Sequence, residues 1–431
     1  MEHSDKAGKL ILLLIYCCIS ALVLFRAAVV PMHYVSPDSI SYLRAADFFQ
    51  HKPAEEIAPP TEEETNTLKQ LIAVWPAGYA TCIALAAKLL NASSLLASKV
   101  VNLLFLGLIF ILLYKWLGKY AWFTGLYFFS YGKLEVFSYT WSEGAFLFFI
   151  ILLSYLLHQD YIHQKRDPYL FLKIFLCLSC LFLFRYAGIT FFFFVAIFLV
   201  YYIVKKQFYK AWHYFLALFL SSAVVILYFL KNYLHTGLYT GTVRNYPERE
   251  SYGYFFQLLY QGMANEFFLA RNYFFSGYTD YLFLGLLLLQ VLLIVVLFRY
   301  RKLITTPFFD SKSLFLIYTG LFYLLITIIL RKISPFDKFD YRILAPFSTP
   351  FFIALFYGLT KQVAFFQKTY KWVVLFMALS FLINLPKNYI LEQFKLIKAT
   401  TSQLKIPLHE SDRSELLENK SQVIFKIFTT A

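Results

Sequence analysis

The residues best suited to chemistry follow the first apolar run directly, in the short segment from Ser36 to Phe49. Ser36 can cap a helix whose first residue is Pro37, and this places Asp38 in the first turn. The helix dipole stabilises an ionised carboxylate at that position, so Asp38 is a candidate general base. Its alternative role is to accept hydrogen bonds from the free N–H groups of that turn, and these residues alone leave both roles open.

Tyr42 shares one face of this helix with Asp38, because side chains four residues apart lie above one another. Asp47 lies about half a turn away from Asp38 around the helix, so the two carboxylates do not form a pair. The sequence therefore predicts a single acidic residue, with Tyr42 beside it, where the chain leaves its first apolar segment.

Other charged residues stand at the ends of apolar runs, where a charge is costly and a function is the default interpretation. Glu143 opens one such run, Arg185 closes another, and Lys133 and Glu135 lie just before an end. These four residues are therefore candidates for a functional site. Arg26 lies within the first run, and its long side chain is expected to snorkel to the membrane interface.

One polar stretch combines bases with glycines in a way that suits a phosphate or a sugar. Lys231 and Arg244 flank Gly237 and Gly241, and hydroxyl residues stand among them. Backbone N–H groups at such glycines, together with nearby bases, can cradle an anion. A plain turn explains the same residues more simply.

A second polar stretch packs four bases between two apolar runs, beginning with Arg331 and ending with Arg342. Bases at this depth can hold the phosphate of a lipid head group. The alternative is that Asp337 and Asp340, which lie in the same stretch, balance the charge of these bases.

All of these residues must be held by membrane-spanning helices, because the composition excludes an aqueous globular fold. The 431 residues are 60% apolar and 15% charged, with a mean hydropathy of +0.60. A crossing needs about 20 apolar residues, and the sequence predicts an all-α polytopic bundle of about eleven spans (roughly 10–13). The predicted spans are Leu10–Val30, Ser98–Leu117, Tyr120–Tyr139, Glu143–Leu157, Tyr169–Phe184, Tyr186–Val204, Trp212–Leu230, Tyr281–Phe298, Ser313–Leu330, Ile343–Thr360 and Trp372–Leu385.

The net charge of +15 reflects orientation in the membrane, not nucleic-acid binding, because clusters of bases directly flank the apolar runs. With the amino terminus in the cytoplasm, the basic clusters all fall in short inside loops, at Lys115, Lys165, Lys205, Arg299 and Lys361. The apolar stretch Trp75–Leu90 is short for a crossing, and we predict a juxtamembrane or re-entrant helix there.

This topology divides the chain into a transmembrane module, residues 1–385, and a short extracytoplasmic tail, residues 386–431. Three outer loops are predicted within the module, at residues 31–97, 231–280 and 331–342. The polar groups that could do chemistry therefore gather on one side of the membrane.

Several classes of site are absent from the sequence. There is no phosphate-binding loop, no G-x-G-x-x-G and no D-x-D motif, so nothing indicates a nucleotide or nucleotide-sugar site. The five cysteines lie in apolar stretches, which favours buried packing over disulfides or zinc. No cofactor is expected, and no metal-ligand spacing is present.

In the order of its elements, most of the chain resembles the GT-C class of membrane glycosyltransferases, which includes protein O-mannosyltransferases and lipid A aminoarabinose transferases. The similarity is moderately specific as an ordered set. It rests on Asp38, Tyr42, Ala45 and Ala46; on Trp75-Pro76-Ala77-Gly78-Tyr79; on Ser142-Glu143; on Arg185-Tyr186-Ala187-Gly188; on Lys231-Asn232-Tyr233, Gly237 and Gly241; and on Asp340-Tyr341-Arg342-Ile343-Leu344-Ala345-Pro346.

The resemblance implies an inverting transfer of a sugar from a polyprenyl-phosphate donor to a lipid, glycan or protein acceptor. It implies that Asp38 is the base and that Glu143 orients the acceptor or a basic partner. The residues expected to neutralise the lipid phosphate are Arg185, Lys231, Arg244, Arg331 and Arg342, with Tyr42 and Tyr186 as further substrate contacts. It also implies a bacterial inner membrane with the site on the periplasmic side.

One departure from the family pattern concerns metal dependence. Many relatives have two adjacent acidic residues in the first loop, whereas Ser39 follows Asp38 here, which disfavours a metal-assisted mechanism. A divalent metal is thus not supported by the sequence.

Two other functions remain open. A polysaccharide polymerase or ligase also has many spans and lipid-linked substrates, and there an arginine or histidine would outrank Asp38. A transporter or flippase of lipid-linked saccharides would show internal repeats, broken helices and paired charges within the bundle. No convincing repeat is present in the sequence.

Overall fold

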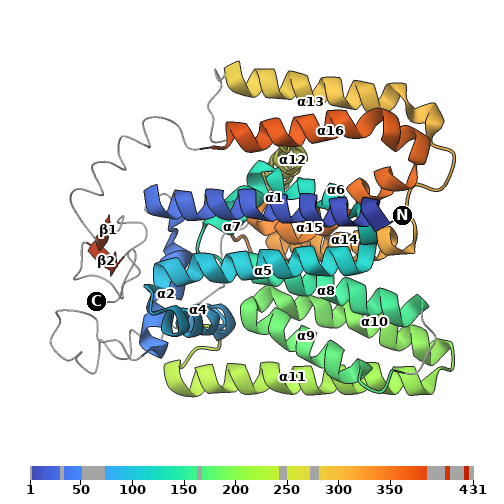
Figure 1. The fold of residues 1–431 in the computed structure, drawn as a ribbon. Helices are drawn as coiled ribbons and strands as arrows, with labels where there is room; N and C mark the ends of the chain where they lie inside the picture. The colour runs from blue at the N-terminus through green and yellow to red at the C-terminus, as the bar shows by residue number, and fades with distance from the viewer. Residues whose placement is uncertain are drawn as a thin grey trace.

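The computed structural model describes residues 2–29, 34–50, 73–162, 167–241, 250–271, 281–385, 403–407 and 422–426. These residues form an all-α bundle and one small antiparallel pair of strands (Figure 1). The elements are α1 (Glu2–Val29), α2 (Pro37–Phe49), α4 (Ala77–Leu90), α5 (Ser94–Leu117), η2 (Gly118–Tyr120), α6 (Ala121–Gly125), η3 (Leu126–Phe129), α7 (Tyr131–Ser138), α8 (Glu143–Ile162), α9 (Leu170–Phe184), η4 (Tyr186–Ile189), α10 (Thr190–Val204), α11 (Phe208–Thr236), α12 (Tyr252–Phe267), α13 (Tyr281–Arg299), η5 (Arg301–Leu303), α14 (Ser311–Ile333), α15 (Tyr341–Lys361), α16 (Val363–Ile383), β1 (Gln403–Pro407) and β2 (Gln422–Lys426).

The described helices include seven that are long and apolar enough to cross a membrane, so the chain is an integral membrane protein. Two predicted spans correspond to shorter apolar helices, α9 and the stretch Leu284–Arg299 of α13. The seven are Lys6–Ala28, Ser94–Phe129, Glu143–Ile162, Tyr186–Val204, Phe208–Thr236, Ser311–Ile333 and Tyr341–Lys361.

The predicted crossing Tyr120–Tyr139 is not one helix, and this is a correction to the sequence interpretation. The chain passes through η2, α6, η3 and α7 instead. At Ser130 the backbone is extended, with φ −66° and ψ 147°, so the helix breaks there. After the break, the amide of Tyr131 donates to the carbonyl of Leu269, 2.8 Å away, instead of continuing the helical hydrogen-bond pattern.

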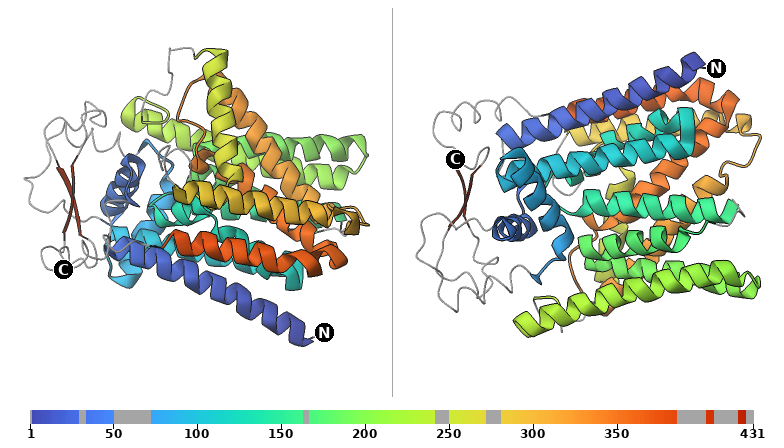
Figure 2. Two further views of the ribbon diagram at one scale, coloured as in Figure 1. Left: turned by 90° about the horizontal axis from the view of Figure 1, so that it is seen from above. Right: turned by 60° about the horizontal axis from the view of Figure 1, so that its bottom comes forward.

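α2 and α4 lie across one end of the bundle, at the opposite end from the amino terminus (Figures 1 and 2). The predicted cap of α2 is confirmed, because the Ser36 hydroxyl accepts the amide of Ser39 at 3.3 Å and Pro37 is the first residue. α4 has 14 residues, fewer than a membrane crossing needs, and packs against α2 and α5.

α15 is the central helix of the bundle, and 89% of its apolar stretch is buried (Figure 1). At the bundle edge, by contrast, only 22% of the apolar stretch of α11 is buried, which leaves most of it to lipid. Gly320 of α14 lets the two helices approach closely, since a Cβ there would lie 2.7 Å from the Phe347 carbonyl oxygen. The start of α15 is thus fixed firmly at the end where α2 lies.

Candidate functional site

Four charged side chains meet where α2, α8, α9 and α15 come together. The guanidinium of Arg342 contacts the Asp38 carboxylate through Nη1 and the Glu143 carboxylate through Nε. Arg185 Nη1 contacts the same Glu143 oxygen, Oε1. Glu143 therefore joins two arginines, and Arg342 joins two carboxylates.

The four side chains of the cluster differ in how far they are exposed to solvent. The side chain of Glu143 is 1% exposed and that of Asp38 is 23% exposed, while both arginines are close to a tenth exposed. A buried ion pair is expensive to break, because removing one partner leaves an uncompensated charge. Asp38 therefore forms the accessible edge of the site and Glu143 its fixed centre.

Local structure explains why Arg342 and Arg185 lie there. Asp340 caps α15, accepting the amides of Arg342 and Ile343 at 3.0 and 2.9 Å, so Arg342 stands in the first turn of the central helix. Arg185 ends α9 in an extended conformation. Gly188, just beyond it, allows η4 to fold back against the Leu181 backbone, where a Cβ would lie 2.3 Å from the carbonyl.

Aromatic rings frame the two arginines. The Arg342 guanidinium lies 4.8 Å from the ring of Trp141 and 6.0 Å from that of Trp75, and Arg185 lies 6.0 Å from Trp75. Tyr42 stacks on Trp75, with ring centroids 6.1 Å apart, and its hydroxyl is 2.9 Å from Ser142 Oγ. Such rings fix guanidinium orientation and offer flat apolar surfaces to a substrate.

Two pKa shifts outside the spans affect the site. Burial raises the pKa of the Tyr42 hydroxyl well above its usual range, so Tyr42 is a neutral hydrogen-bonding group. Burial also raises the pKa of Asp340 to about 6, against the effect of its backbone hydrogen bond to Ile343 and of the charge on Arg342. Asp340 is therefore largely ionised at neutral pH, consistent with its role as a cap.

Five of the residues predicted from the sequence are brought together here. They are Asp38, Tyr42, Glu143, Arg185 and Arg342. Ser36 Oγ accepts a hydrogen bond from the Ser39 amide in the first turn of α2, while the Asp38 carboxylate pairs with Arg342. Ser36 thus fills the capping role that the sequence left open for Asp38, and Asp38 belongs to the charged cluster.

Three other predicted residues lie apart from the cluster, and a fourth lies outside the described residues. The Tyr186 hydroxyl donates to the Ala73 carbonyl at 2.8 Å, so it positions the chain just before Trp75. Lys231 is exposed on α11, and the described contacts do not join it to the cluster. Arg244 lies outside the described residues.

Arg331 is paired elsewhere, and the proposed charge balance of its loop is corrected. Its Nη1 donates to Glu250 at 2.7 Å, its Nη2 contacts the same carboxylate, and its Nε donates to the Asp337 backbone carbonyl at 3.1 Å. The carboxylate of Asp340 caps α15. The carboxylates that balance Arg331 and Arg342 therefore come from distant parts of the chain, which the local sequence does not reveal.

The expectation that Arg26 snorkels to the interface is wrong. Its side chain is 5% exposed and pairs with Glu135 at 3.0 Å, while Nη1 also donates to Ser138 Oγ at 2.9 Å. An arginine within the first span is stable there because α7, after the break at Ser130, supplies these acceptors.

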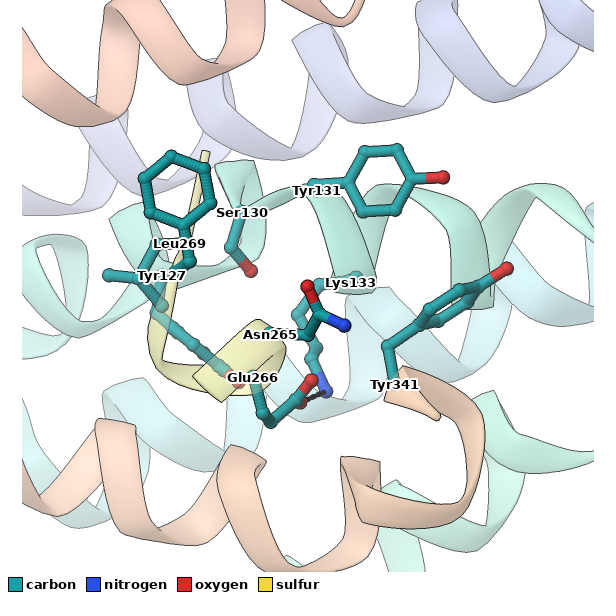
Figure 3. Close-up of a pocket in the computed structure, with 10 residues that line it drawn as sticks. Tyr127, Ser130, Tyr131, Lys133, Asn265, Glu266, Leu269 and Tyr341 are labelled. Carbon is teal, nitrogen blue, oxygen red and sulfur yellow. Dashed lines mark hydrogen bonds and ion pairs between the residues drawn. The ribbon is translucent and has the colours of Figure 1, made fainter. Parts of the chain in front are cut away.

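A second buried ion pair lies beside the start of α15 (Figure 3). Lys133 Nζ lies 3.2 Å from Glu266 Oε1, and Ser348 contacts the same oxygen. A cavity of about 10 Å³, room for one water molecule, is lined by these charges together with Ser130 and Tyr341. Glu266 comes from α12, which runs across the bundle axis (Figures 1 and 2).

Sequence reasoning missed three residues that shape the site: Trp75 and Trp141 as ring surfaces, and Lys99 as a support. Lys99 Nζ donates to the Ser138 carbonyl at 2.7 Å and to Thr140 Oγ1 at 2.9 Å, which holds the segment leading to Glu143. A lysine inside a predicted span was the available signal for Lys99. In the part of the chain described, no group of three or more His, Cys, Asp or Glu side chains could hold a metal ion.

No protein-family model and no curated protein matches the chain. Among solved structures it is similar to the crystal structure of ArnT from Cupriavidus metallidurans bound to undecaprenyl phosphate, with a TM-score of 0.50 and 14% identity, over 81% of this chain and 60% of that one. The apo-state structure of ArnT aligns with a TM-score of 0.41 and 14% identity, over 75% and 58%. The chain thus spans less than two thirds of that protein's length. The GT-C-like fold predicted from the sequence is confirmed.

Proposed function

We propose that this chain, whose fold is GT-C-like, is a membrane glycosyltransferase that takes its sugar from a polyprenyl-phosphate-linked donor. The observation that carries the proposal is the cluster of Asp38, Arg342, Glu143 and Arg185, which combines a partly exposed carboxylate with two arginines. A reaction that removes a proton and releases a phosphate needs these two kinds of group side by side.

Asp38 is the proposed general base. It lies in the first turn of α2, at the end of the bundle where α2 and α4 cross, and it is the most exposed charge of the cluster. An acceptor hydroxyl or amine next to Asp38 loses its proton to the carboxylate as it attacks the anomeric carbon. The bond from that carbon to the phosphate oxygen breaks, and polyprenyl phosphate leaves with the electron pair, giving inversion.

Arg185 and Arg342 are the proposed ligands of the leaving phosphate. Guanidinium groups bind phosphate oxygens through two parallel hydrogen bonds, and both groups are held rigidly by Glu143. We assign no phosphate contact to Arg331, because it is committed to Glu250. The proposed mechanism uses no metal ion.

The solved structure that this chain is similar to contains undecaprenyl phosphate, which supports a polyprenyl-phosphate lipid as the donor carrier here. The acceptor is proposed to be a lipid, a glycan or a protein on the outer side of the membrane. We place the protein in a bacterial inner membrane, with the cluster facing the periplasm.

A second candidate, a transporter of lipid-linked saccharides, has one observation in its favour. The pairs Lys133–Glu266 and Arg26–Glu135 are buried charges within the bundle, as transporters often have, and the chain breaks at Ser130. A polymerase or ligase remains a variant of the first proposal, in which Arg185 or Arg342 would matter more than Asp38.

The experiment compares glycolipids and envelope glycans by mass spectrometry in cells with and without the chain. Removal should eliminate one sugar from one acceptor, and the native chain should restore it. Asp38→Asn should not restore it, whereas Asp47→Asn should, because Asp47 lies on the same helix but contacts Ser94. Restoration by Asp38→Asn at a normal level of inserted protein would exclude Asp38 as the base.

A further inference from the structure

We infer that Arg342 exchanges one ligand when the donor binds: it holds Asp38 in the free protein and passes that contact to the donor phosphate, which releases Asp38 to act as base. This inference rests on the proposed function and names how the same site is regulated. It follows from the unequal positions of the two carboxylates that Arg342 contacts.

Asp38 and Glu143 hold different parts of the guanidinium. Glu143 binds Nε, is 1% exposed and also binds Arg185. Asp38 binds Nη1, is 23% exposed and, among the described residues, pairs with one arginine. An anion arriving from the accessible side therefore meets the Asp38 contact first, and the Glu143 contact stays covered.

Exchange at Asp38 leaves no buried charge without a partner. Glu143 keeps both arginines, and the phosphate replaces Asp38 on Arg342 with oxygens that suit a guanidinium fork. Asp38 is partly exposed and stands in the first turn of α2, so the N-terminus of the helix still stabilises its charge after release. Exchange at Glu143 would instead take one of its two arginines from a fully buried carboxylate.

The charge count of the cluster points the same way. Two arginines balance two carboxylates, so an added phosphate makes the cluster anionic unless one carboxylate moves away. Asp38 is the carboxylate that can move with least loss of contact, because Glu143 is shared by both arginines.

The consequence for the reaction is an order of events. While Arg342 holds Asp38 Oδ2, that oxygen is engaged by the guanidinium and not by an acceptor. Donor binding frees it, the acceptor proton passes to Asp38, the acceptor atom bonds to the anomeric carbon, and the phosphate leaves on the arginines. Base and leaving-group ligand thus become available together, and an acceptor alone is not activated.

The test follows the reactivity of the Asp38 carboxyl with a carbodiimide, read by peptide mass spectrometry on the purified full chain in phosphatidylcholine nanodiscs. Undecaprenyl phosphate should raise modification of Asp38 several-fold, and the neutral undecaprenol should not. Unchanged or reduced modification with undecaprenyl phosphate would overturn the inference.

Two arginine variants distinguish ligand exchange at Arg342 from a general loosening of the fold. Arg342→Lys removes the fork that reaches both carboxylates, so Asp38 should be reactive without lipid and undecaprenyl phosphate should add little. Arg331→Lys is the matched control, because Arg331 pairs with Glu250, and it should respond as the native chain does. Equal lipid responses in both variants would contradict a specific role for Arg342.

Sugar transfer measured on the same preparations distinguishes this inference from the proposed function. If Asp38→Asn abolishes transfer but lipid does not change the reactivity of Asp38, the function stands and the exchange is wrong. If Asp38→Asn transfers sugar normally, the function itself is wrong.

Discussion

A single glutamate organises the charges on which the proposed chemistry depends. Glu143 is almost completely buried, and one of its oxygens receives both Arg185 and Arg342. Its other oxygen, Oε2, has no hydrogen-bond partner among the described residues. The position of both arginines therefore depends on the charge of this side chain and not only on its shape.

Glu143→Gln tests that dependence. The amide keeps the size of the side chain but leaves two buried guanidinium groups facing one carboxylate, which should cost about 3 kcal/mol of stability. Displacement of the arginines should lower sugar transfer roughly 10²-fold. Thermal unfolding in detergent and a transfer assay measure the two effects.

Glu250→Gln is the matched control for this change, because Glu250 pairs with Arg331 away from the cluster and its side chain is 17% exposed. It should lower the unfolding temperature less and leave transfer close to the native level. Equal loss of sugar transfer in Glu143→Gln and Glu250→Gln would show that transfer does not depend specifically on Glu143.

Residue types were enough to find Asp38, Glu143, Arg185 and Arg342, because a charge at the end of an apolar run is rare and needs a reason. Tyr42 was found from the helix face that it shares with Asp38. Their pairing was not predictable. Arg342 is 199 residues from Glu143, and contacts at such separation depend on how the helices pack. The tryptophans were missed because aromatic residues are common throughout this chain.

At the scale of elements, the turn from α9 through η4 is what delivers Arg185. Gly188 lies against the Leu181 backbone so closely that no side chain fits without a shift. Tyr186 in the same turn binds the Ala73 carbonyl and so links this turn to the segment carrying Trp75. One tight turn thus positions both an arginine of the cluster and its aromatic neighbour.

Gly188→Ala should displace η4, because the added Cβ would lie 2.3 Å from backbone atoms of Leu181. We expect a loss of about 1–3 kcal/mol in stability and reduced transfer, measured by thermal unfolding and the transfer assay. Gly253→Ala is the control, since a Cβ at Gly253 meets nothing within 4 Å. If Gly188→Ala unfolds at the native temperature and transfers normally, the turn does not set the position of Arg185.

The sequence predicted where helices form better than it predicted where a helix is interrupted. The cap of α2 follows from Ser36 and Pro37, and the shortness of α4 follows from the length of its apolar stretch. The break at Ser130 was not predicted, because Tyr120–Tyr139 contains no proline and its charges, Lys133 and Glu135, were interpreted as lying near the end of one continuous span. It arises from contacts with Leu269 and Arg26, which only the packed bundle supplies.

At the scale of the whole molecule, the two crossing helices α2 and α4 lie at the end of the bundle opposite the amino terminus (Figure 1). The cluster lies at this end because Asp38 stands in the first turn of α2. Basic residues such as Lys205 lie at the turn between α10 and α11, and α11 ends near the α2–α4 end. The positive-inside rule then predicts an amino terminus in the cytoplasm and a cluster on the outer side, as we propose.

Cysteine labelling tests this orientation. In a chain whose five native cysteines are replaced, His235→Cys should react with a membrane-impermeant maleimide in intact cells, and Lys205→Cys should react only after permeabilisation. Both positions are exposed, so burial does not confound the comparison. The reverse pattern would place Asp38 on the cytoplasmic side and exclude an outer glycosyltransferase.

The most direct measurement of the central claim is the release of polyprenyl phosphate by the purified chain. Lipids from cells that lack the chain would supply the accumulated donor, and mass spectrometry would count polyprenyl phosphate and sugar-bearing acceptor together. The native chain and Asp47→Asn should form both products in equal amounts, and Asp38→Asn should form them at least roughly 10²-fold more slowly. Equal rates for the native chain and Asp38→Asn, or sugar transfer with no polyprenyl phosphate released, would contradict the account.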